Sequence, residues 1–326
     1  MGKVIVFGSM NMDLSIESAR MPEAGETIAG SGFLTNPGGK GANQAVACAR
    51  LGAPTTMLAA VGADAFGDEL VRGLEAAGVD CARVVRSKCE STGVAVILRS
   101  GGDNRIVLHA GANHALGAEE ATTALKGCAE PGDVLVCQGE CAWEATRAVM
   151  HAARELGLWV LFNPAPARAV EPEVWADVDL VCLNETECEV VCGVLPADAA
   201  SAREACERLR ALGAGEVVVT MGGSGSAGMG ADGRLVEVPA RAAGSVVDTT
   251  AAGDTFIGAL AAGHLRGLSL AEAMAWGSAA AGITVTRLGA QQAIPTAAEV
   301  AAVVGGSAEA EGDGSGARVA EAGQEG

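Results

Sequence analysis

Short apolar runs recur along this chain, and they constrain its fold more than any other feature of the sequence. Most are rich in β-branched residues and bounded by Gly, Asp or Asn, as is typical of strands buried on both faces. The runs are KVIVF (3–7), TTMLAAV (55–61), DVLVCQ (133–138), LWVLF (158–162), DLVCL (179–183) and EVVVT (216–220). Helix-like segments follow most of them, at 40–51, 65–77, 143–156 and 198–212. The repeated β-α pattern predicts an α/β fold with a doubly wound, mostly parallel sheet.

Three other regions depart from this pattern. Residues 13–35 and 93–109 alternate like exposed antiparallel strands, and the second region contains SGGDN, a turn that suits a hairpin. Two interpretations remain open for them: a small β-structure that projects from the main sheet as a lid, or ordinary edge strands. Residues 305–326 are rich in Gly, Ala and Glu without apolar periodicity, so we expect a disordered acidic tail there.

Composition excludes several classes of protein. With 326 residues, 49% of them hydrophobic, the chain can bury a full core. Its formal charge of −18 and its 3% of aromatic residues argue against binding to nucleic acid or anionic membranes. No run reaches about 18 apolar residues, the length a membrane helix needs. The first residues enter a strand-like run at once, so we expect a cytoplasmic protein, or an organellar one if a targeting segment has been removed.

The cysteine pattern does not indicate a metal or disulfide framework. The chain has ten Cys without a C-x-x-C pair, and its four His are scattered. We therefore expect small buried or half-buried thiols in a reducing compartment.

The stretch TTAAGDTF (249–256) lies between a strand-like run and a segment with helical spacing. The small residues Ala251, Ala252 and Gly253 would leave backbone N–H groups uncovered at a helix N-terminus, where the helix dipole also attracts anions. Asp254 follows in the first turn, as a carboxylate that can accept a proton from an attacking hydroxyl. The alternative is that Asp254 caps the helix and the small residues only pack.

Two glycine-rich stretches are similar to nucleotide-binding motifs, but neither fits its motif fully. In NPGGKGANQAV (36–46), Lys40 is followed by Gly41 instead of Ser or Thr, so this is not a phosphate loop. Lys40 and Asn43 can instead donate to the hydroxyls of a polar ligand, unless the lysine is simply solvated. GSGSAG (223–228) fits G-x-G-x-x-G, but a turn and a strand follow instead of a helix, which argues against a dinucleotide site. The turn after Thr220 can still let a nucleotide lie against the backbone.

Polar residues follow three of the apolar runs. They are Asn11 and Asp13, then Glu140, then Asn184 and Glu187. Each alone is compatible with a helix cap or a loop residue. Together they put acids and amides at one edge of the sheet, where open α/β sheets bind ligands.

Several long motifs occur in an order that identifies a family. GGKGANQAVACARLG (38–52) and DTTAAGDTFIGAL (248–260) match its two signature regions, and STGVAVIL, HAGAN, NPAPAR, NETE and VTRLGAQ match further segments. Over residues 3–304 the chain resembles the ribokinase/PfkB family of sugar kinases. The resemblance implies a three-layer α/β/α kinase domain over 1–304. It also implies that segments 13–35 and 93–109 form a lid that closes over the sugar and pairs two subunits into a homodimer.

The resemblance also implies an activity, the ATP-dependent phosphorylation of D-ribose at the 5-hydroxyl to give ribose 5-phosphate and ADP. Asp254 matches the family's catalytic base, and the amides of Ala251, Ala252 and Gly253 match its anion hole. Together with Asp254, the positions that match ribose contacts are Asn11, Asp13, Gly39, Lys40, Asn43 and Glu140.

The nucleotide and ion sites are also implied by the resemblance. Positions that match ATP contacts are Asn184, Thr220, Gly222, Gly225, Gly253 and Ser278, and Glu187 matches an N-x-x-E motif associated with Mg²⁺. Positions that match a K⁺ site built mainly from carbonyls are Asp248, Thr250, Thr284, Arg287 and Gly289. The chain departs from the family at Ser278, where a larger Asn or His is expected, and at Ala293, near an expected serine.

Other activities remain open. An adenosine, fructose or 2-keto-3-deoxygluconate kinase is an alternative within the family, although the set of sugar-side residues favours ribose. A catalytically silent sugar-binding regulator is a further alternative, which the presence of Asp254 disfavours.

Overall fold

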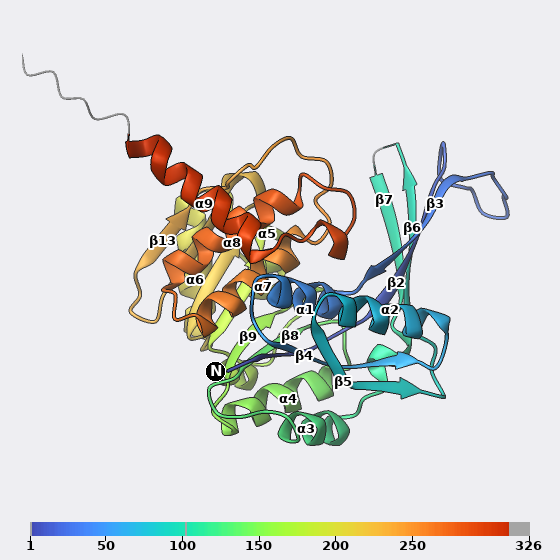
Figure 1. The fold of residues 1–326 in the computed structure, drawn as a ribbon, viewed down its shortest axis with the longest axis horizontal. Coiled ribbons are helices and arrows are strands. Elements are labelled where there is room, and N and C mark those ends of the chain that lie inside the picture. The colour runs from blue at the N-terminus through green and yellow to red at the C-terminus, as the bar shows by residue number, and fades with distance from the viewer. Residues whose placement is uncertain (1, 102, 313–326) are drawn as a thin grey trace, which may run out of the picture.

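A nine-stranded sheet forms the centre of the computed structural model, which describes residues 2–101 and 103–312 (Figure 1). Its strand order is β13-β12-β11-β10-β9-β8-β1-β4-β5. The strands are β1 Val4–Phe7, β4 Thr55–Gly62, β5 Val79–Ser87, β8 Val134–Gln138, β9 Trp159–Asn163, β10 Leu180–Asn184, β11 Glu216–Thr220, β12 Ser226–Met229 and β13 Leu235–Val238. All pairs from β5 to β11 are parallel, while β12 and β13 pair antiparallel at one edge. The six apolar runs therefore form the strands that the sequence predicts.

Helices cover both faces of this sheet. One layer contains α1 Lys40–Arg50, α2 Ala65–Ala76, α7 Ala252–Leu265, α8 Leu270–Thr284 and α9 Ala297–Gly312; the other contains α3 Ala118–Lys126, α4 Trp143–Glu155, α5 Glu185–Cys192 and α6 Ala199–Leu212. Short 3-10 turns lie at η1 Gly111–His114, η2 Pro172–Asp177, η3 Gly222–Ser224 and η4 Gln291–Ala293. Alternate residues of β1 enter different cores: Val4 and Val6 pack on the first layer, Ile5 and Phe7 on the second. The three-layer α/β/α fold is confirmed.

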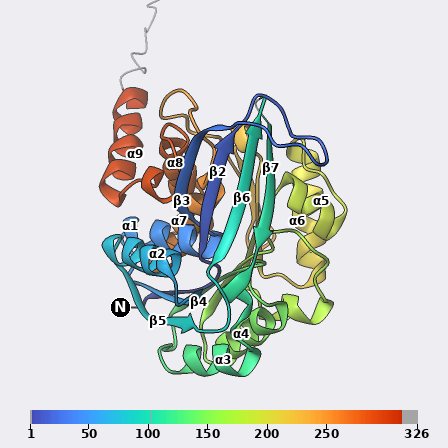
Figure 2. The ribbon, with the colours of Figure 1, turned by 90° about the vertical axis from the view of Figure 1, so that its right-hand side faces the viewer.

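A second, four-stranded sheet stands apart from the central one, and Figure 2 shows its strands side by side. It has the order β3-β2-β6-β7, with β2 Asn11–Glu17, β3 Ser31–Gly38, β6 Gly93–Ser100 and β7 Asp103–His109. The prediction of a small separate β-structure is thus confirmed, and the edge-strand interpretation is wrong. The expectation of antiparallel strands fails for one pair, because β2 and β6 are parallel. They follow β1 and β5, which themselves run in the same direction in the central sheet.

The C-terminal helix is longer than expected. α9 continues to Gly312, past the boundary predicted at residue 304, where the sequence is rich in the helix formers Ala and Glu. The expectation of disorder is therefore not met for 305–312, and the rest of the predicted tail lies outside the described residues. In the part of the chain that is described, no helix is long and apolar enough to cross a membrane.

Candidate active site

The candidate site begins where the strand order reverses. In the sheet β1 lies between β4 and β8. The chain first adds β4 and β5 on one side of β1, and later adds β8 and the strands after it on the other side. A crevice at the carboxyl ends of the strands is expected at such a point. Ser9 follows β1 and Glu140 follows β8, and the Ser9 hydroxyl donates a short hydrogen bond to the Glu140 carboxylate. The same carboxylate accepts a hydrogen bond from the backbone N–H of Lys40 at 3.1 Å, which brings α1 to the crevice.

Glycines allow α1 to start directly against the chain that follows β1. Gly39 has φ 90°, a conformation that favours glycine, and a Cβ atom there would lie 2.8 Å from the Asn11 nitrogen. A Cβ atom on Gly41 would lie 2.5 Å from the carbonyl carbon of Gly8. The GGKG stretch therefore brings Lys40 and Asn43 to the crevice by close backbone contact.

The start of β2 supplies two further polar side chains. Asn11 is buried, and its Oδ1 accepts a hydrogen bond from Asn113 Nδ2 at 2.7 Å. Asn113 in turn accepts from the Met10 backbone N–H at 2.8 Å. Burial, reinforced by the negative charge of Glu140, raises the pKa of Asp13 to about 7. These residues form a partly desolvated polar group at the base of the small sheet.

The N-terminus of α7 has an unusual geometry. Its N-cap residue, Ala251, adopts the left-handed conformation with φ 60°, which costs a non-glycine residue about 1–2 kcal/mol. No described side chain caps this helix, whereas Asp64 caps α2 and Ser269 caps α8. An uncapped helix end next to a strained residue is suited to binding an anion through its backbone amides.

Asp254 points from α7 toward α1. Its Oδ2 accepts a hydrogen bond from Asn43 Nδ2 at 2.9 Å, and its Oδ1 accepts one from Gln44 Nε2 at 2.9 Å. Since the carboxylate is held by the neighbouring helix, Asp254 does not cap α7. The first of the two interpretations for TTAAGDTF fits this geometry, because the carboxylate lies beside the uncapped amides.

Lys40 lies among acidic groups. Burial alone would lower the pKa of its ammonium group, but three nearby carboxylates outweigh burial and raise that pKa: Asp254, Glu140 and Glu187. Lys40 also lines a polar cavity, so it is not a lysine on an open surface.

This polar cavity, about 230 Å³ in volume, opens at the carboxyl ends of the central strands. Asn184, the last residue of β10, and Glu187 of α5 line it, and they form a capping box. Asn184 Oδ1 accepts from the Glu187 N–H at 2.8 Å, and Glu187 Oε2 accepts from the Asn184 N–H at 3.0 Å. The cap interpretation therefore holds for Asn184, which also faces the cavity. Burial raises the pKa of Glu187, despite the hydrogen bond from Asn184.

A second cavity of about 400 Å³ adjoins the first, and its walls are mainly small and apolar. Thr220, Thr249 and Gly253 line both cavities. Ser278 lines the second one, where its hydroxyl donates to the Pro239 carbonyl at 2.8 Å and accepts from the Arg241 N–H at 3.1 Å. Together the two cavities contain every position that matches an ATP contact: Asn184, Thr220, Gly222, Gly225, Gly253 and Ser278.

Part of the predicted K⁺ region forms a connected group. Asp248 accepts hydrogen bonds from the Thr250 N–H at 2.9 Å and from the Gly289 N–H at 3.0 Å. Burial acts to raise the pKa of Asp248, but these hydrogen bonds outweigh it and hold the pKa below its ordinary value. The group joins the loop before α7 to the loop after α8.

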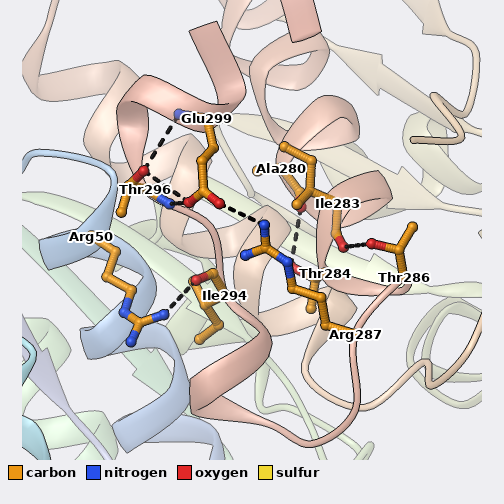
Figure 3. Close-up of polar contacts among 9 residues, drawn as sticks. All are labelled: Arg50, Ala280, Ile283, Thr284, Thr286, Arg287, Ile294, Thr296 and Glu299. Atoms are coloured by element: carbon orange, nitrogen blue, oxygen red, sulfur yellow. Dashed lines mark hydrogen bonds and ion pairs between the residues drawn. The ribbon is translucent and has the colours of Figure 1, made fainter. Parts of the chain in front are cut away.

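The other two side chains of that region have partners of their own (Figure 3). The Thr284 hydroxyl donates to the Ala280 carbonyl at 3.0 Å, inside its own helix, and Arg287 pairs with Glu299 of α9 at 2.5 Å. The Thr284 carbonyl accepts a hydrogen bond from the Arg287 N–H at 3.1 Å, so both residues are tied to the end of α8 and to α9. Ala293 is buried in η4.

Five polar residues of the site were missed in the sequence: Ser9, Gln44, Asn113, Gln138 and Asn163. Gln138 and Asn163 are the last residues of β8 and β9. A polar residue that ends an otherwise apolar strand is a signal that could have identified both. Gln44 and Asn113 belong to the matched GGKGANQ and HAGAN motifs, and their partners are distant in sequence.

An uncapped amide cradle, an adjacent carboxylate and a polar cavity that opens into an apolar one define a small-molecule kinase of the α/β class. More specifically, the chain belongs to the pfkB family of carbohydrate kinases, because the model of that family matches residues 1–297. The family resemblance inferred from the motifs is therefore confirmed.

Individual relatives cover nearly all of the chain. A ribokinase of Mus musculus is 36% identical over 297 residues, which is 90% of this chain and 91% of the relative. A deoxyribokinase of Salmonella typhi is 36% identical over 299 residues, or 90% and 95% of the two chains. Among solved structures, an Arabidopsis thaliana ribokinase complexed with ribose and ATP has a TM-score of 0.87 and 30% identity, and the match covers 93% of this chain and 99% of that one.

Proposed function

We propose that this protein phosphorylates D-ribose at its 5-hydroxyl with ATP, giving ribose 5-phosphate and ADP. The observation that carries the proposal is the Asp254 carboxylate, held by two amides of α1 beside the uncapped N-terminus of α7. Relatives with the name ribokinase, and a solved relative described as complexed with ribose and ATP, support the choice of substrates.

The sugar would bind at the crevice beside β1 and β8. We assign its contacts to Asn11, Asp13, Gly39, Lys40, Asn43 and Glu140, with Asp254 at the reacting hydroxyl. Amides, carboxylates and an ammonium group suit a ligand with several hydroxyls, since each hydroxyl both donates and accepts. The Glu140 carboxylate accepts from Ser9 and from the Lys40 N–H, which fixes its position at the sugar.

Asp254 would act as the general base. It accepts the proton of the 5-hydroxyl as that oxygen attacks the terminal phosphate. The backbone amides of Ala251, Ala252 and Gly253 would then stabilise the negative charge on the transferring group. The Ala252 N–H donates to the Thr249 carbonyl at 3.2 Å in this structure and would have to exchange that partner for the phosphate. Lys40 is kept charged by the surrounding carboxylates and would bind the same phosphate.

The two adjoining cavities suit ATP. Small apolar walls in the larger cavity fit the adenine base, and the polar cavity that shares Gly253 with it fits the phosphates. Ser278 would lie beside the base and tie α8 to the loop that carries Pro239.

The Glu187 carboxylate of α5 is suited to bind Mg²⁺. Glu187 is a carboxylate whose pKa is raised by burial, and a divalent cation offsets the cost of keeping such a group ionised. Mg²⁺, when bound, supplies charge neutralisation to the phosphates of the nucleotide.

The loops beside the anion cradle fit K⁺. Asp248 would hold the two loops together, and the backbone carbonyls of the region would provide the ligands of the ion: Thr250, Thr284, Arg287 and Gly289 among them. Carbonyl oxygens are hard, uncharged ligands, which suit a large monovalent cation; the side chains of Thr284 and Arg287 have partners of their own and are not assigned as ligands.

The test is ADP production from MgATP and D-ribose, with and without K⁺. We expect ADP release that depends on ribose and rises with K⁺. If ADP forms only with adenosine, fructose or another sugar, the proposed substrate is wrong. If ribose binds while no sugar supports ADP release, the protein is a sugar-binding regulator.

2-Deoxyribose is a second candidate substrate, favoured by the deoxyribokinase relative at the same 36% identity. A site that binds a sugar hydroxyl through buried polar groups rejects the analogue that lacks it by about 10⁴–10⁵ in kcat/KM. The ratio of kcat/KM for ribose and 2-deoxyribose therefore decides between the two.

The small sheet would serve as a lid and as the contact between two subunits. Its strands expose large apolar side chains: Phe33, Leu34, Val96, Ile106, Val107 and Leu108. Apolar residues that gather on a protruding sheet are typical of an interaction surface. Sedimentation of the wild type should give a dimer, and Val107→Glu should shift it toward the monomer; a monomeric wild type would contradict this assignment.

A further inference from the structure

Gln44 is an amide at the centre of a buried hydrogen-bond network. Its side chain is fully buried, with 0% exposure. Its Oε1 accepts from Gln138 Nε2 at 2.7 Å, while its Nε2 donates to Asp254 Oδ1 at 2.9 Å and to Asn163 Oδ1 at 3.3 Å. Every hydrogen that the Gln44 amide can donate therefore has a partner, and so does its oxygen.

The strand ends determine how this amide is oriented. Gln138 and Asn163 are register partners at the ends of β8 and β9, so they offer Gln44 a donor and an acceptor side by side. The ionised Asp254 carboxylate only accepts hydrogen bonds, so the nitrogen of Gln44 points toward it, and the oxygen of Gln44 faces Gln138, which donates to it. A buried amide turned the other way would face the carboxylate with its oxygen, which is unfavourable.

Close helix packing sets the distance between Gln44 and Asp254. One turn after Asp254, a Cβ atom on Gly258 would lie 3.0 Å from the backbone nitrogen of Cys48, which itself is one turn after Gln44. The Cys48 thiol also donates to the Gly258 carbonyl at 3.8 Å. The two helices thus touch through their backbones, and the short link between residues 44 and 254 is rigid.

The network also reaches the second carboxylate of the polar cavity. Asn163 Nδ2 donates to the Cys182 carbonyl at 3.0 Å and approaches Glu187 Oε2 at 3.4 Å. Asp254 and Glu187 both line that cavity. One amide network, on the sheet edge below the cavity, therefore connects the two acids.

We propose that Gln44 is a positioning residue that orients the Asp254 carboxylate for proton transfer, and that Gln138 holds Gln44 in the required orientation. This inference depends on the proposed function, in which Asp254 is the base. With Asn43 on one oxygen and Gln44 on the other, rotation of the carboxylate is prevented, and each oxygen keeps a further lone pair for the sugar hydroxyl.

The test is Gln44→Met, which preserves the volume of the side chain and removes its amide. We expect kcat to fall by roughly 10-fold to 10²-fold, because a small misplacement of a reacting group costs about that much. The KM values for ribose and ATP should stay within about twofold.

Two comparisons separate positioning from a general loss of stability. Thr146→Val removes a buried hydroxyl of α4 that donates to the Ala142 carbonyl, and it should lower Tm without changing kcat or KM. Gln138→Met should reproduce part of the Gln44→Met effect, and the double variant should be less impaired than the two single effects combined. An unchanged kcat in Gln44→Met would overturn the proposal, as would effects that simply follow Tm.

A measurement without turnover makes the outcome independent of the proposed function. The Asp254 carboxyl carbon can be observed by ¹³C NMR in the resting protein at a fixed pH, with Asp254→Asn used to identify its signal. Gln44→Met should change the chemical shift of this carbon even if no sugar is phosphorylated, because one oxygen loses its hydrogen-bond donor, and an unchanged chemical shift would overturn the inference. Absence of ADP release from the wild type on every sugar would instead contradict the proposed function alone.

Discussion

The helices α7 and α8 follow one another in the chain, and both have an acid at the third position of the helix, yet the two acids act in different ways. In α8, Glu272 turns back to accept hydrogen bonds from Ser269 at 2.8 Å and 2.6 Å, in a complete capping box. In α7, Asp254 turns away to the amides of α1, and the N-cap position holds the strained Ala251. The comparison teaches that the N-cap residue decides whether the first turn stabilises the helix or leaves its amides for a ligand.

Asp254→Asn should give the largest effect, because it removes the proposed base and leaves the shape of the site. We expect kcat to fall by about 10²–10⁴-fold, while ribose binding measured by calorimetry stays close to that of the wild type. A variant that keeps more than about a tenth of the wild-type kcat would contradict the assignment of the base.

Ala251→Asp tests the cradle itself. Asp tolerates the left-handed conformation, so the helix should still form, but the added carboxylate would repel the phosphates. We expect kcat/KM for ATP to fall by about tenfold, with a smaller change for ribose. Ala251→Asn is the matched control, since it has nearly the same shape without the charge. Equal losses in both variants would show that shape, and not charge, is important here.

Asp13→Asn tests the buried acid on the sugar side. Because its pKa is about 7 in the folded protein and lower in the unfolded chain, the folded state favours the protonated form. The associated stability is present below about pH 4 and is lost as the pH rises to about 7. Asp13→Asn should therefore match the wild type in Tm near pH 4 and exceed it by roughly a few degrees near pH 8. A gap in Tm that does not depend on pH would contradict the raised pKa.

Ser269→Ala should have the smallest effect and no effect on activity. Loss of an N-cap hydrogen bond costs about 1 kcal/mol in the free energy of unfolding, which corresponds to a decrease of about 1–2 °C in Tm for a chain of this size. Steady-state kinetics with ribose and ATP should be unchanged. A fall in kcat would mean that the α8 cap also supports the site, and that the contrast between the two helices is less sharp.

Much of the fold could be predicted because buried strands and amphipathic helices leave local patterns. The six apolar runs predicted six of the nine strands of the central sheet, without β5, β12 and β13, and the two alternating regions predicted the small sheet. The parallel pairing of β2 with β6 was missed, since it depends on the direction of β1 and β5 and not on local sequence. The length of α9 was missed because Ala and Glu form helices without an apolar pattern.

The site could be predicted where motifs are contiguous, as in GGKGANQ and AAGD. The amide network around Gln44 could not, because its partners Gln138, Asn163 and Asp254 lie on three other elements far away in sequence. Only the fold brings these groups within hydrogen-bond distance. Each of them alone is a common polar residue with many possible roles.

The place where β2 begins has a consequence for how this molecule can change. Asn11 and Asp13 belong to the strand that supports the small sheet, whereas Asp254 is fixed to α1 and the central sheet. Two of the proposed sugar contacts therefore belong to the small sheet, whereas Lys40, Asn43 and Glu140 lie with Asp254 in the central part of the fold. Substitutions in the small sheet should therefore alter one side of the sugar site and leave the reacting carboxylate in place.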